Sequence, residues 1–533
     1  MINTKTIYLY IMSQTFKYGQ DQLTVATALE LAAGRMQGVL TPEVMARVEA
    51  SHGHVQAIVK EHTVVYGINT GFGPLCDTRI SEADTRALQY NILQSHSVGV
   101  GAPIPEEIAR LMLITKVQAL AQGYSGVNPA TLERILWHID RRITPLVPEK
   151  GSVGASGDLA PLSHLFLPLI GLGEVWYDGK RMPAAEALRQ EGKDPVVLGP
   201  KEGLALINGT QFILSFAVKA VERLHNALEA ADIIGAMSLE GLMGTAKPFD
   251  PRLHAIRSYA GNQLVAHRLE ALLRGSEIMA SHVDCGRVQD PYSLRCMPQV
   301  HGASRTAWKH LEELTAIELN AVTDNPIIFS EHDTISGGNF HGQPMALPLD
   351  YATVAAAELG NIADRRCYMM IEGRYGLPKL LIEDAGLNSG FMIPQYTTAA
   401  LVTENKTLCF PASADSVPTS LGQEDHVSMG SISGRKLLQV IGNLEYILAI
   451  ELLYAAQAID FRRPLQSAKV IEACHHYVRE KVSFAKKDRV FAHDIAALHA
   501  IITDQSLIRV ADTVATQHQI NLNGPYEKQF QLS

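Results

Sequence analysis

Long segments with helical periodicity constrain what this chain can fold into more than any other feature of its sequence. Apolar residues recur at three- and four-residue steps from Leu437 to Leu452, as on one face of a helix. The segment from Gln211 to Met243 is apolar on more than one stripe, and Tyr351 to Arg366 is rich in alanine, a strong helix former. Helices that are apolar nearly all round are buried by other helices. The sequence therefore predicts a mainly α fold with a long central helical bundle.

The length of the chain predicts more than one packed part. With 533 residues it exceeds the size at which a single core stops growing, yet no Pro/Ser/Gly-rich linker separates independent halves. We expect a smaller, loop-rich N-terminal part over residues 1–210 and the bundle with C-terminal helices over residues 211–533. Strand patterns are few, but Glu174 to Gly179 predicts a short hairpin that turns at Asp178-Gly179.

Charge and apolar patterning disfavour several classes of partner. The formal net charge is -9, and a mildly acidic surface does not attract nucleic acid or anionic membranes. The longest apolar run, Leu162 to Val175, is broken by Pro168 and two glycines, so it cannot span a bilayer as a regular helix. Residues Met1 to Met12 lack a signal-peptide cleavage site, and Met12 is an alternative start. We expect a cytoplasmic protein.

Cysteine and histidine spacing gives no indication of a disulfide framework or a metal site. The six cysteines are scattered without a CxxC pair, which favours reduced thiols. The clusters His52/His54, His475/His476 and 424–426 lack further ligands at a recognisable spacing. We therefore expect no required metal.

The glycine-rich segment Gly151 to Asp158 carries unusual chemistry. It lacks the lysine of a P-loop and the spacings of GxGxxG and GxSxG. If the chain bends tightly here, the amide nitrogen of Gly157 can attack the carbonyl carbon of Ala155, and loss of water closes a five-membered ring. Loss of the Ser156 hydroxyl as a second water leaves an exocyclic methylene. Glycine is needed because it lacks a Cβ and allows both the approach and the strained backbone.

This segment and several further loops resemble the aromatic amino acid ammonia-lyase family. The resemblance runs from roughly Leu23 to Arg463. The strings that carry it are Gly151-Ser-Val-Gly-Ala-Ser-Gly-Asp-Leu-Ala-Pro-Leu-Ser-His, Tyr66-Gly-Ile-Asn-Thr-Gly-Phe-Gly, Lys201-Glu-Gly-Leu-Ala-Leu-Ile-Asn-Gly-Thr-Gln, Gln289-Asp-Pro-Tyr-Ser-Leu-Arg-Cys, Thr323-Asp-Asn-Pro, Ser336-Gly-Gly-Asn-Phe-His and Asn388-Ser-Gly-Phe-Met. The resemblance implies an ammonia-lyase-like fold and the prosthetic group 4-methylideneimidazole-5-one (MIO), formed autocatalytically from Ala155, Ser156 and Gly157. It also implies a homotetramer with active sites shared between subunits, and no external cofactor.

The resemblance further implies roles for single residues. Tyr66 is expected to be the base that removes the β-proton, which requires a pKa below the usual value of about 10; helix N-termini aimed at the site would lower it. Arg295 is expected to bind the substrate carboxylate, because its planar fork pairs with two oxygens. Asn208 is expected to support the electrophile or the carboxylate. The remaining matches to pocket positions of the family are Gln289, Tyr292 and Phe340.

Two positions bear on the identity of the substrate. Ser95-His96 resembles the histidine-acting members, whereas phenylalanine and tyrosine lyases carry an aromatic residue or histidine followed by leucine there. A histidine can exchange a hydrogen bond with a substrate imidazole. Glu424 falls in a segment that is uncharged and amide-rich in phenylalanine lyases; a buried carboxylate is costly beside an aromatic ring but has a partner in an imidazole. Both positions favour L-histidine, with trans-urocanate and ammonium as products in the first step of histidine degradation.

Other functions remain open from the residues alone. The same chemistry could act on tyrosine or phenylalanine, or a 2,3-aminomutase could return the ammonia to the substrate. An inactive homologue kept for binding would be expected to lose Ser156, Tyr66 or Arg295, and all three are present. A hydrolase triad of Ser156, His164 and Asp158 has the right residue types, but nothing in their spacing supports it.

Overall fold

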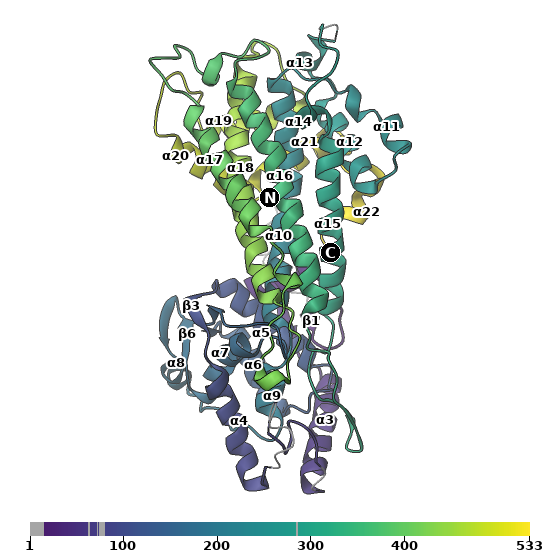
Figure 1. Cartoon of the computed structure of the whole chain (residues 1–533), viewed down its shortest axis with the longest axis vertical. Coiled ribbons are helices and arrows are strands. Elements are labelled where there is room, and N and C mark those ends of the chain that lie inside the picture. The colour runs from purple at the N-terminus through teal and green to yellow at the C-terminus, as the bar shows by residue number, and fades with distance from the viewer. Residues whose placement is uncertain (1–14, 62–63, 72, 74–79, 284–285) are drawn as a thin grey trace, which may run out of the picture.

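The structure is a computed structural model, which describes residues 15–61, 64–71, 73, 80–283 and 286–533. The N-terminal segment up to Met12, Cys76 and Cys285, all considered above, lie outside the described residues. The molecule is elongated, with a compact N-terminal part below and a tall helical bundle above (Figure 1). The prediction of a mainly α fold with a central bundle is confirmed.

Four long helices form the bundle: α10 (Gln211–Gly241), α15 (Met297–Glu318), α16 (Gln343–Ile371) and α18 (Gly430–Asp460). They run side by side along the long axis of the molecule (Figure 1), and α18 packs against both α10 and α16. The segments predicted around Tyr351 and Leu437 lie within α16 and α18, and the third matches α10 except for its last two residues, Leu242 and Met243, so the three helices are confirmed.

The helix α16 is longer than the sequence pattern indicates. It starts at Gln343, with Pro344 in its first turn and Pro348 inside it. An interior proline removes one backbone hydrogen bond and usually ends a helix. Here Pro348 is buried in the bundle core, where packing compensates for that loss.

The helix α18 is long and apolar enough to cross a membrane by length and composition alone. However, 72% of its most apolar window is buried inside the protein. That burial is what the central helix of a bundle requires, since its apolar sides are covered by α10, α16 and α17 (Met392–Leu408).

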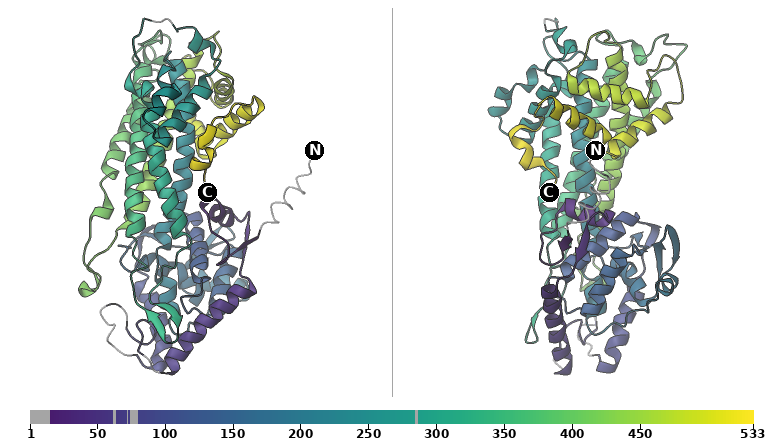
Figure 2. Two further views of the ribbon diagram at one scale, coloured as in Figure 1. Left: turned by 90° about the vertical axis from the view of Figure 1, so that its right-hand side faces the viewer. Right: turned by 180° about the vertical axis from the view of Figure 1, so that it is seen from behind.

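Shorter helices build the N-terminal part and cover the upper bundle. Those of the N-terminal part are α2 (Val25–Ala33), α3 (Pro42–Lys60), α4 (Glu82–His96), α5 (Glu106–Leu120), α6 (Pro129–Asp140), α7 (Leu159–Phe166), α8 (Ala184–Gln190) and α9 (Glu202–Ile207). Those of the upper part are α11 (Pro251–Ala255), α12 (Ala260–Leu273), α13 (Glu277–Ala280), α14 (Tyr292–Arg295), α19 (Lys469–Lys481), α20 (Phe491–Thr503), α21 (Ser506–Gln517) and α22 (Glu527–Phe530). The C-terminal helices lie against one side of the bundle (Figure 2).

Strands are short and form four small sheets in the described residues. Their bounds are β1 (Thr15–Lys17) with β2 (Gln37–Val39), β3 (Val100–Pro103) with β5 (Pro148–Lys150), β4 (Thr144–Pro145) with β6 (Glu174–Tyr177) and β7 (Lys180–Pro183), and β8 (Ile327–Ser330) with β9 (Asp333–Ile335). The hairpin prediction is confirmed, because β6 and β7 pair antiparallel around Asp178 and Gly179. Both turn residues have positive φ (51° and 71°), as a two-residue hairpin turn requires.

Candidate active site

A cavity of about 420 Å³ lies in the N-terminal part, below the start of the bundle. Its wall comes from Tyr66, Gly71, Gly73, Ile80, Leu88, Asn91, Ile92, Ser95, His96, Ser156, Leu159, Leu204, Asn208, Ser420 and Glu424. The cavity is not the largest, since one of about 540 Å³ lies beside Trp137. It is distinguished by its residues: five of the side chains predicted to be functional, from sequence positions 66 to 424, meet here.

The Ala155-Ser156-Gly157 segment is bent and tightly enclosed at one end of this cavity. Gly157 has φ +76°, and a Cβ on it would lie 2.1 Å from the carbonyl oxygen of Gly209. The two glycines form an isolated β-bridge, and the backbone N–H of Asp158 donates to the same Gly209 oxygen at 2.7 Å. Only glycine fits at position 157, because the neighbouring atoms belong to backbone and cannot move aside cheaply.

The carboxylate of Asp158 ties the segment to the bundle. It accepts hydrogen bonds from the backbone N–H of Ile213, at 3.0 Å, and from the hydroxyl of Ser152, at 2.9 Å. Burial raises the pKa of Asp158 to about 7, and the hydrogen bonds partly oppose this rise.

Three helices begin beside the bent segment. α7 starts at Leu159, α10 at Gln211 and α18 at Gly430. The loop before α18 is attached directly, because the backbone N–H of Met429 donates to the carbonyl of Val153 at 2.9 Å. Helix N-termini carry partial positive charge, so the segment lies in a field that favours negative charge.

Asn208 occupies the wall next to the segment, at the end of α9. Its side-chain Oδ1 is buried and has no hydrogen-bond partner among the described residues. Its backbone carbonyl accepts a short hydrogen bond from the ammonium group of Lys116. Lys116 is 1% exposed, and burial lowers its pKa to about 7, with the neighbouring Lys201 lowering it and Asp324 opposing the change.

Lys116 is a site residue that sequence analysis missed. It is a single lysine inside the apolar run of α5, which resembles a solvent-exposed position interrupting a core helix. The signal that could have found it is helical periodicity, because the apolar residues three and four positions away, Met112, Leu113 and Leu120, share its face of the helix. Lys201 and Asp324, whose charges act on Lys116, form a buried ion pair with each other at 2.8 Å.

Tyr66 also lines the cavity and lies in a turn after α3. Its hydroxyl accepts a hydrogen bond from the backbone N–H of Gly73 at 3.2 Å. Phe72, which belongs to the same predicted loop, lies outside the described residues.

His96 and Glu424 line the same cavity although they are far apart in sequence. His96 ends α4, and burial lowers its pKa, while the nearby charge of Glu424 acts in the opposite direction. Its Nδ1 shares a hydrogen bond with the hydroxyl of Ser95 at 2.9 Å. A neutral imidazole offers one donor and one acceptor.

The carboxylate of Glu424 is held by three hydroxyl groups. Ser156 donates to Oε1 at 2.8 Å, and both Thr419 and Ser420 donate to Oε2 at 2.9 Å. The carboxylate is therefore oriented toward the tripeptide segment.

Four predicted residues do not line the cavity of their own chain. Gln289, Tyr292 and Arg295 lie at the top of the bundle, at and before α14 (Figure 1), and Phe340 precedes α16. The backbone N–H of Thr245, just beyond the C-terminal end of α10, donates to Asp290, whereas the cavity adjoins the N-terminal end of α10. A helix of 31 residues spans roughly 46 Å at 1.5 Å per residue, so Gln289, Tyr292 and Arg295 cannot reach the cavity of their own chain.

The hydrolase triad considered above is not formed. His164 accepts a hydrogen bond from the backbone of Gly99, Ser156 donates to Glu424, and Asp158 binds Ser152 and Ile213. Within the described ranges, no group of three or more His, Cys, Asp or Glu side chains could hold a metal ion.

Comparison with known proteins identifies the family. The family model described as aromatic amino acid lyase matches residues 23–480. A protein of Stigmatella aurantiaca named histidine ammonia-lyase is 47% identical over 94% of this chain and 98% of its own length. One of the same name from Symbiobacterium thermophilum is 48% identical over 92% of this chain and 97% of its own.

Solved structures agree with this result. A histidine ammonia-lyase from Trypanosoma cruzi has a TM-score of 0.87 and 39% identity, covering 97% of each chain. A tyrosine aminomutase from Streptomyces globisporus has a TM-score of 0.88 and 34% identity, covering 94% of this chain and 99% of its own. With the family model covering most of the chain and its close relatives matching nearly end to end, this chain belongs to the aromatic amino acid lyase family.

Proposed function

We propose that the protein is a carbon–nitrogen lyase that eliminates ammonia from L-histidine to give trans-urocanate, the first step of histidine degradation. The observation that carries the proposal is the meeting of His96 and Glu424 with Ser156 in one cavity. The similarity to relatives named histidine ammonia-lyase, at 47–48% identity over nearly the whole chain, supports it.

The tripeptide segment fits the prosthetic group MIO, formed from Ala155, Ser156 and Gly157 by loss of two waters. The fit rests on the enclosed bend at Gly157, which a Cβ would fill, and on the buried, unpartnered Oδ1 of Asn208 beside it. When formed, the group supplies an electron-poor methylidene carbon to which the substrate amine can bind, so that ammonia becomes a better leaving group. We infer that no external cofactor or metal takes part.

Tyr66 is proposed as the base that removes the β-proton. Its hydroxyl borders the cavity, and the N–H of Gly73 helps to fix the position of the oxygen. A base must lie within hydrogen-bond reach of the proton that it removes. Ser156 lines the same cavity, so a substrate bound there can contact both groups.

His96 and Glu424 are proposed to recognise the substrate imidazole. A neutral His96 exchanges one hydrogen bond with a ring nitrogen, and the carboxylate of Glu424 accepts from the other ring N–H. A phenyl ring offers neither partner and would leave a carboxylate facing apolar carbon, at a cost of several kcal/mol. This is the physical basis for choosing histidine over phenylalanine.

Arg295 of a neighbouring subunit is proposed to bind the substrate carboxylate, together with Gln289, Tyr292 and Phe340. Tyr292 is 71% exposed in one chain. The bundle helices α15, α16 and α17 also carry exposed apolar residues, which are Ile317, Leu347, Tyr351, Val354, Tyr368, Ile393 and Tyr396. Exposed apolar residues that form one contiguous patch are typical of a protein interface. We infer a cytoplasmic homotetramer whose active sites combine residues from several chains.

The experiment that tests the proposal is a near-ultraviolet assay of the purified protein with L-histidine, L-tyrosine and L-phenylalanine in parallel. Each product of elimination is a conjugated acrylate that absorbs in this range. We expect urocanate from histidine and no comparable product from the other two. Coumarate or cinnamate would contradict the specificity argument, and a β-amino acid would indicate an aminomutase.

A further inference from the structure

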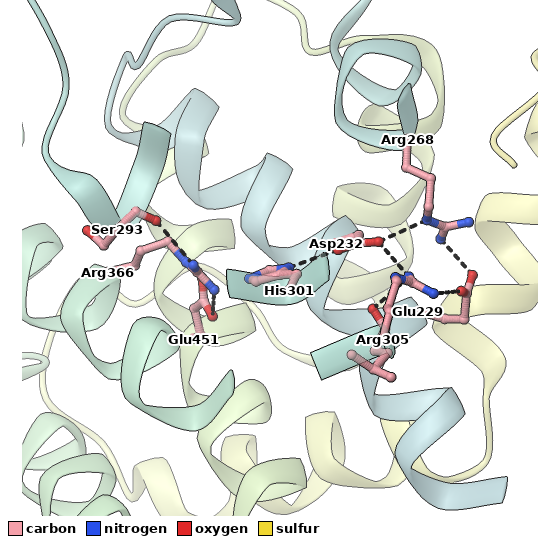
Figure 3. A network of polar contacts seen from close by, with 9 residues as sticks. Glu229, Asp232, Arg268, Ser293, His301, Arg305, Arg366 and Glu451 are labelled. Carbon is pink, nitrogen blue, oxygen red and sulfur yellow. Dashed lines mark hydrogen bonds and ion pairs between the residues drawn. The ribbon is translucent and has the colours of Figure 1, made fainter. Parts of the chain in front are cut away.

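A line of buried charged side chains crosses the upper bundle and ends at the turn that carries Tyr292 and Arg295 (Figure 3). Its members come from α10, α12, α15, α16 and α18 and are Glu229, Asp232, Arg268, His301, Arg305, Arg366 and Glu451. At its centre, the carboxylate of Asp232 pairs with two arginines and with the Nδ1 of His301 at 2.8 Å. All the helices of the bundle core contribute to this line.

The end of the line nearest the turn is the ion pair of Arg366 and Glu451. Both side chains are 0% exposed. The guanidinium donates through Nε to Oε1 at 2.6 Å and through Nη2 to Oε2 at 3.0 Å, a bidentate arrangement. The hydroxyl of Ser238 donates to the same Oε1 at 2.6 Å. The remaining nitrogen of Arg366, Nη1, donates to the carbonyl of Ser293 at 3.2 Å.

Ser293 belongs to α14, a four-residue turn with two different sides. Ser293 and Leu294 are buried against the bundle. On the other side, Tyr292 is exposed, and the guanidinium of Arg295 lies 4.5 Å from the centre of its ring. Arg366 therefore contacts one face of α14, and Tyr292 and Arg295, the two residues predicted to bind substrate, lie on the other face.

A buried ion pair is a costly way to hold helices together, and well-packed apolar residues of similar volume stabilise a fold as well or better. The pair provides something that apolar packing cannot, which is an N–H donor in a defined direction. Because two atoms of the Arg366 fork are bound to Glu451, the direction of the third donor is set, and with it the position of the Ser293 carbonyl.

We propose that Arg366 is a positioning residue for substrate binding. Anchored by Glu451, it holds the Ser293 carbonyl and so sets the orientation of α14 from which Arg295 reaches the substrate carboxylate. This inference rests on the proposed function, because Arg295 meets a substrate only in the assembled lyase.

The first test is the double variant R366M/E451Q. It removes the donor without leaving a single buried charge, and glutamine keeps an acceptor for the Ser238 hydroxyl. We expect the variant to fold and to show the mass loss of two waters, with a KM for L-histidine raised about tenfold or more and a smaller fall in kcat, because a displacement of about 1 Å in a binding group is costly.

A second variant, Arg366→Lys, still tests the inference if the double variant fails to fold. Its ammonium group can pair with Glu451 but cannot hold both carboxylate oxygens and the Ser293 carbonyl together. We expect a KM between those of the parent and R366M/E451Q.

The matched control is R223M/E445Q. Arg223 and Glu445 also form a bidentate pair between bundle helices, at 3.0 and 2.6 Å, and neither contacts α14. We expect the KM of this control to equal that of the parent. Hydrogen–deuterium exchange of the peptide covering residues 290–296 gives an independent readout, with faster exchange expected in both Arg366 variants and not in the control.

The outcomes separate this inference from the proposed function. A parent protein without turnover on L-histidine contradicts the proposed function, while hydrogen exchange still decides whether Arg366 holds α14. An active parent, with the parental KM and parental exchange in both Arg366 variants, overturns the positioning role alone. An equal rise of KM in the control also overturns it, because the effect would then be general to ion pairs between the bundle helices.

Discussion

At the scale of single residues, the hydroxyl of Ser156 connects two parts of the proposed chemistry. It is the group that must leave for the methylidene to form, and in the structure it donates to Glu424, the residue proposed to select the substrate. The variants of these residues therefore separate formation of the prosthetic group from recognition and from proton transfer.

The variant Ser156→Ala is expected to fold and to lose nearly all activity, because alanine has no hydroxyl to eliminate. Its intact mass should show no loss of two waters. Tyr66→Phe should keep that mass loss and reduce kcat by roughly a hundredfold to ten-thousandfold, the usual contribution of a general base. Intact mass spectrometry and the urocanate assay distinguish the two. Full activity in Ser156→Ala would end the mechanism proposed here.

The variant Glu424→Gln is expected to lower kcat/KM for L-histidine about tenfold to a hundredfold, because a hydrogen bond to a charged acceptor is replaced by a neutral one. The mass loss of two waters should be unchanged. Asp425→Asn, next in sequence, exposed and outside the cavity wall, is the matched control and should behave as the parent does. Equal effects of the two substitutions would contradict the proposed recognition of imidazole.

Asp158 predicts a pH dependence of stability. Burial raises its pKa from an ordinary value of 3.8 to about 7, so between these values the folded protein keeps a proton that the unfolded chain releases. This contribution is fully present below pH 3.8 and is lost as the pH rises through 7, by on the order of a few kcal/mol in total. Asp158→Asn cannot ionise and should lack this loss.

The measurement is Tm at pH 5 and pH 8 for Asp158→Asn and its parent, both in the Ser156→Ala background, so that the prosthetic group does not differ between them. We expect the Tm of Asp158→Asn minus the Tm of its parent to be larger at pH 8 than at pH 5. A difference between the two that does not vary with pH would show that Asp158 titrates outside this window.

At the scale of elements, the long helices and the β6–β7 hairpin could be predicted, because each follows from local periodicity or from local turn residues. The start of α16 could not, since Pro348 in an isolated sequence indicates a helix end and only burial in the bundle overrides it. Lys116 was missed for a similar reason. Its partner is the backbone carbonyl of a residue 92 positions away, and no local pattern records such a contact.

The bend at Ala155-Ser156-Gly157 depends on close contact between two loops, the one that carries Gly157 and the one that carries Gly209. In Gly157→Ala the new Cβ would lie 2.1 Å from the Gly209 carbonyl, so the two loops must separate. We expect this variant to lack the mass loss of two waters and to be inactive. Gly192→Ala is the control, because Gly192 also has positive φ (+64°), but a Cβ added there would meet no described atom within 4 Å. It should lose only about 1 kcal/mol of stability and keep its activity.

At the scale of the whole molecule, the predicted site divides into two groups. Tyr66, His96, Ser156, Asn208 and Glu424 meet in one cavity, whereas Gln289, Tyr292, Arg295 and Phe340 do not line it in a single chain. The motifs in the sequence could predict the residues of both groups. They could not predict which residues of one active site come from which subunit, because that depends on how the bundles of different chains pack.

A complementation experiment tests the sharing of sites. Tyr66→Phe and Arg295→Met should each be inactive as a homo-oligomer. When the two chains are co-expressed, sites that draw Tyr66 from one chain and Arg295 from another should recover about a quarter of the parental activity, for random assembly. Size-exclusion chromatography with light scattering checks that mixed tetramers form. Absence of any recovery in such mixed tetramers would place both residues on the same chain.

The hydrogen bond between Ser156 and Glu424 has a consequence for the order of events in the life of the protein. Before the prosthetic group forms, the carboxylate of Glu424, which is proposed to bind the substrate imidazole, accepts a hydrogen bond from the Ser156 hydroxyl that is later lost. Loss of that hydroxyl as water creates the electrophile and releases Oε1 of Glu424 in the same event. In the proposed maturation, the cavity therefore gains the ability to bind histidine through Glu424 in the same step in which it gains the ability to convert it.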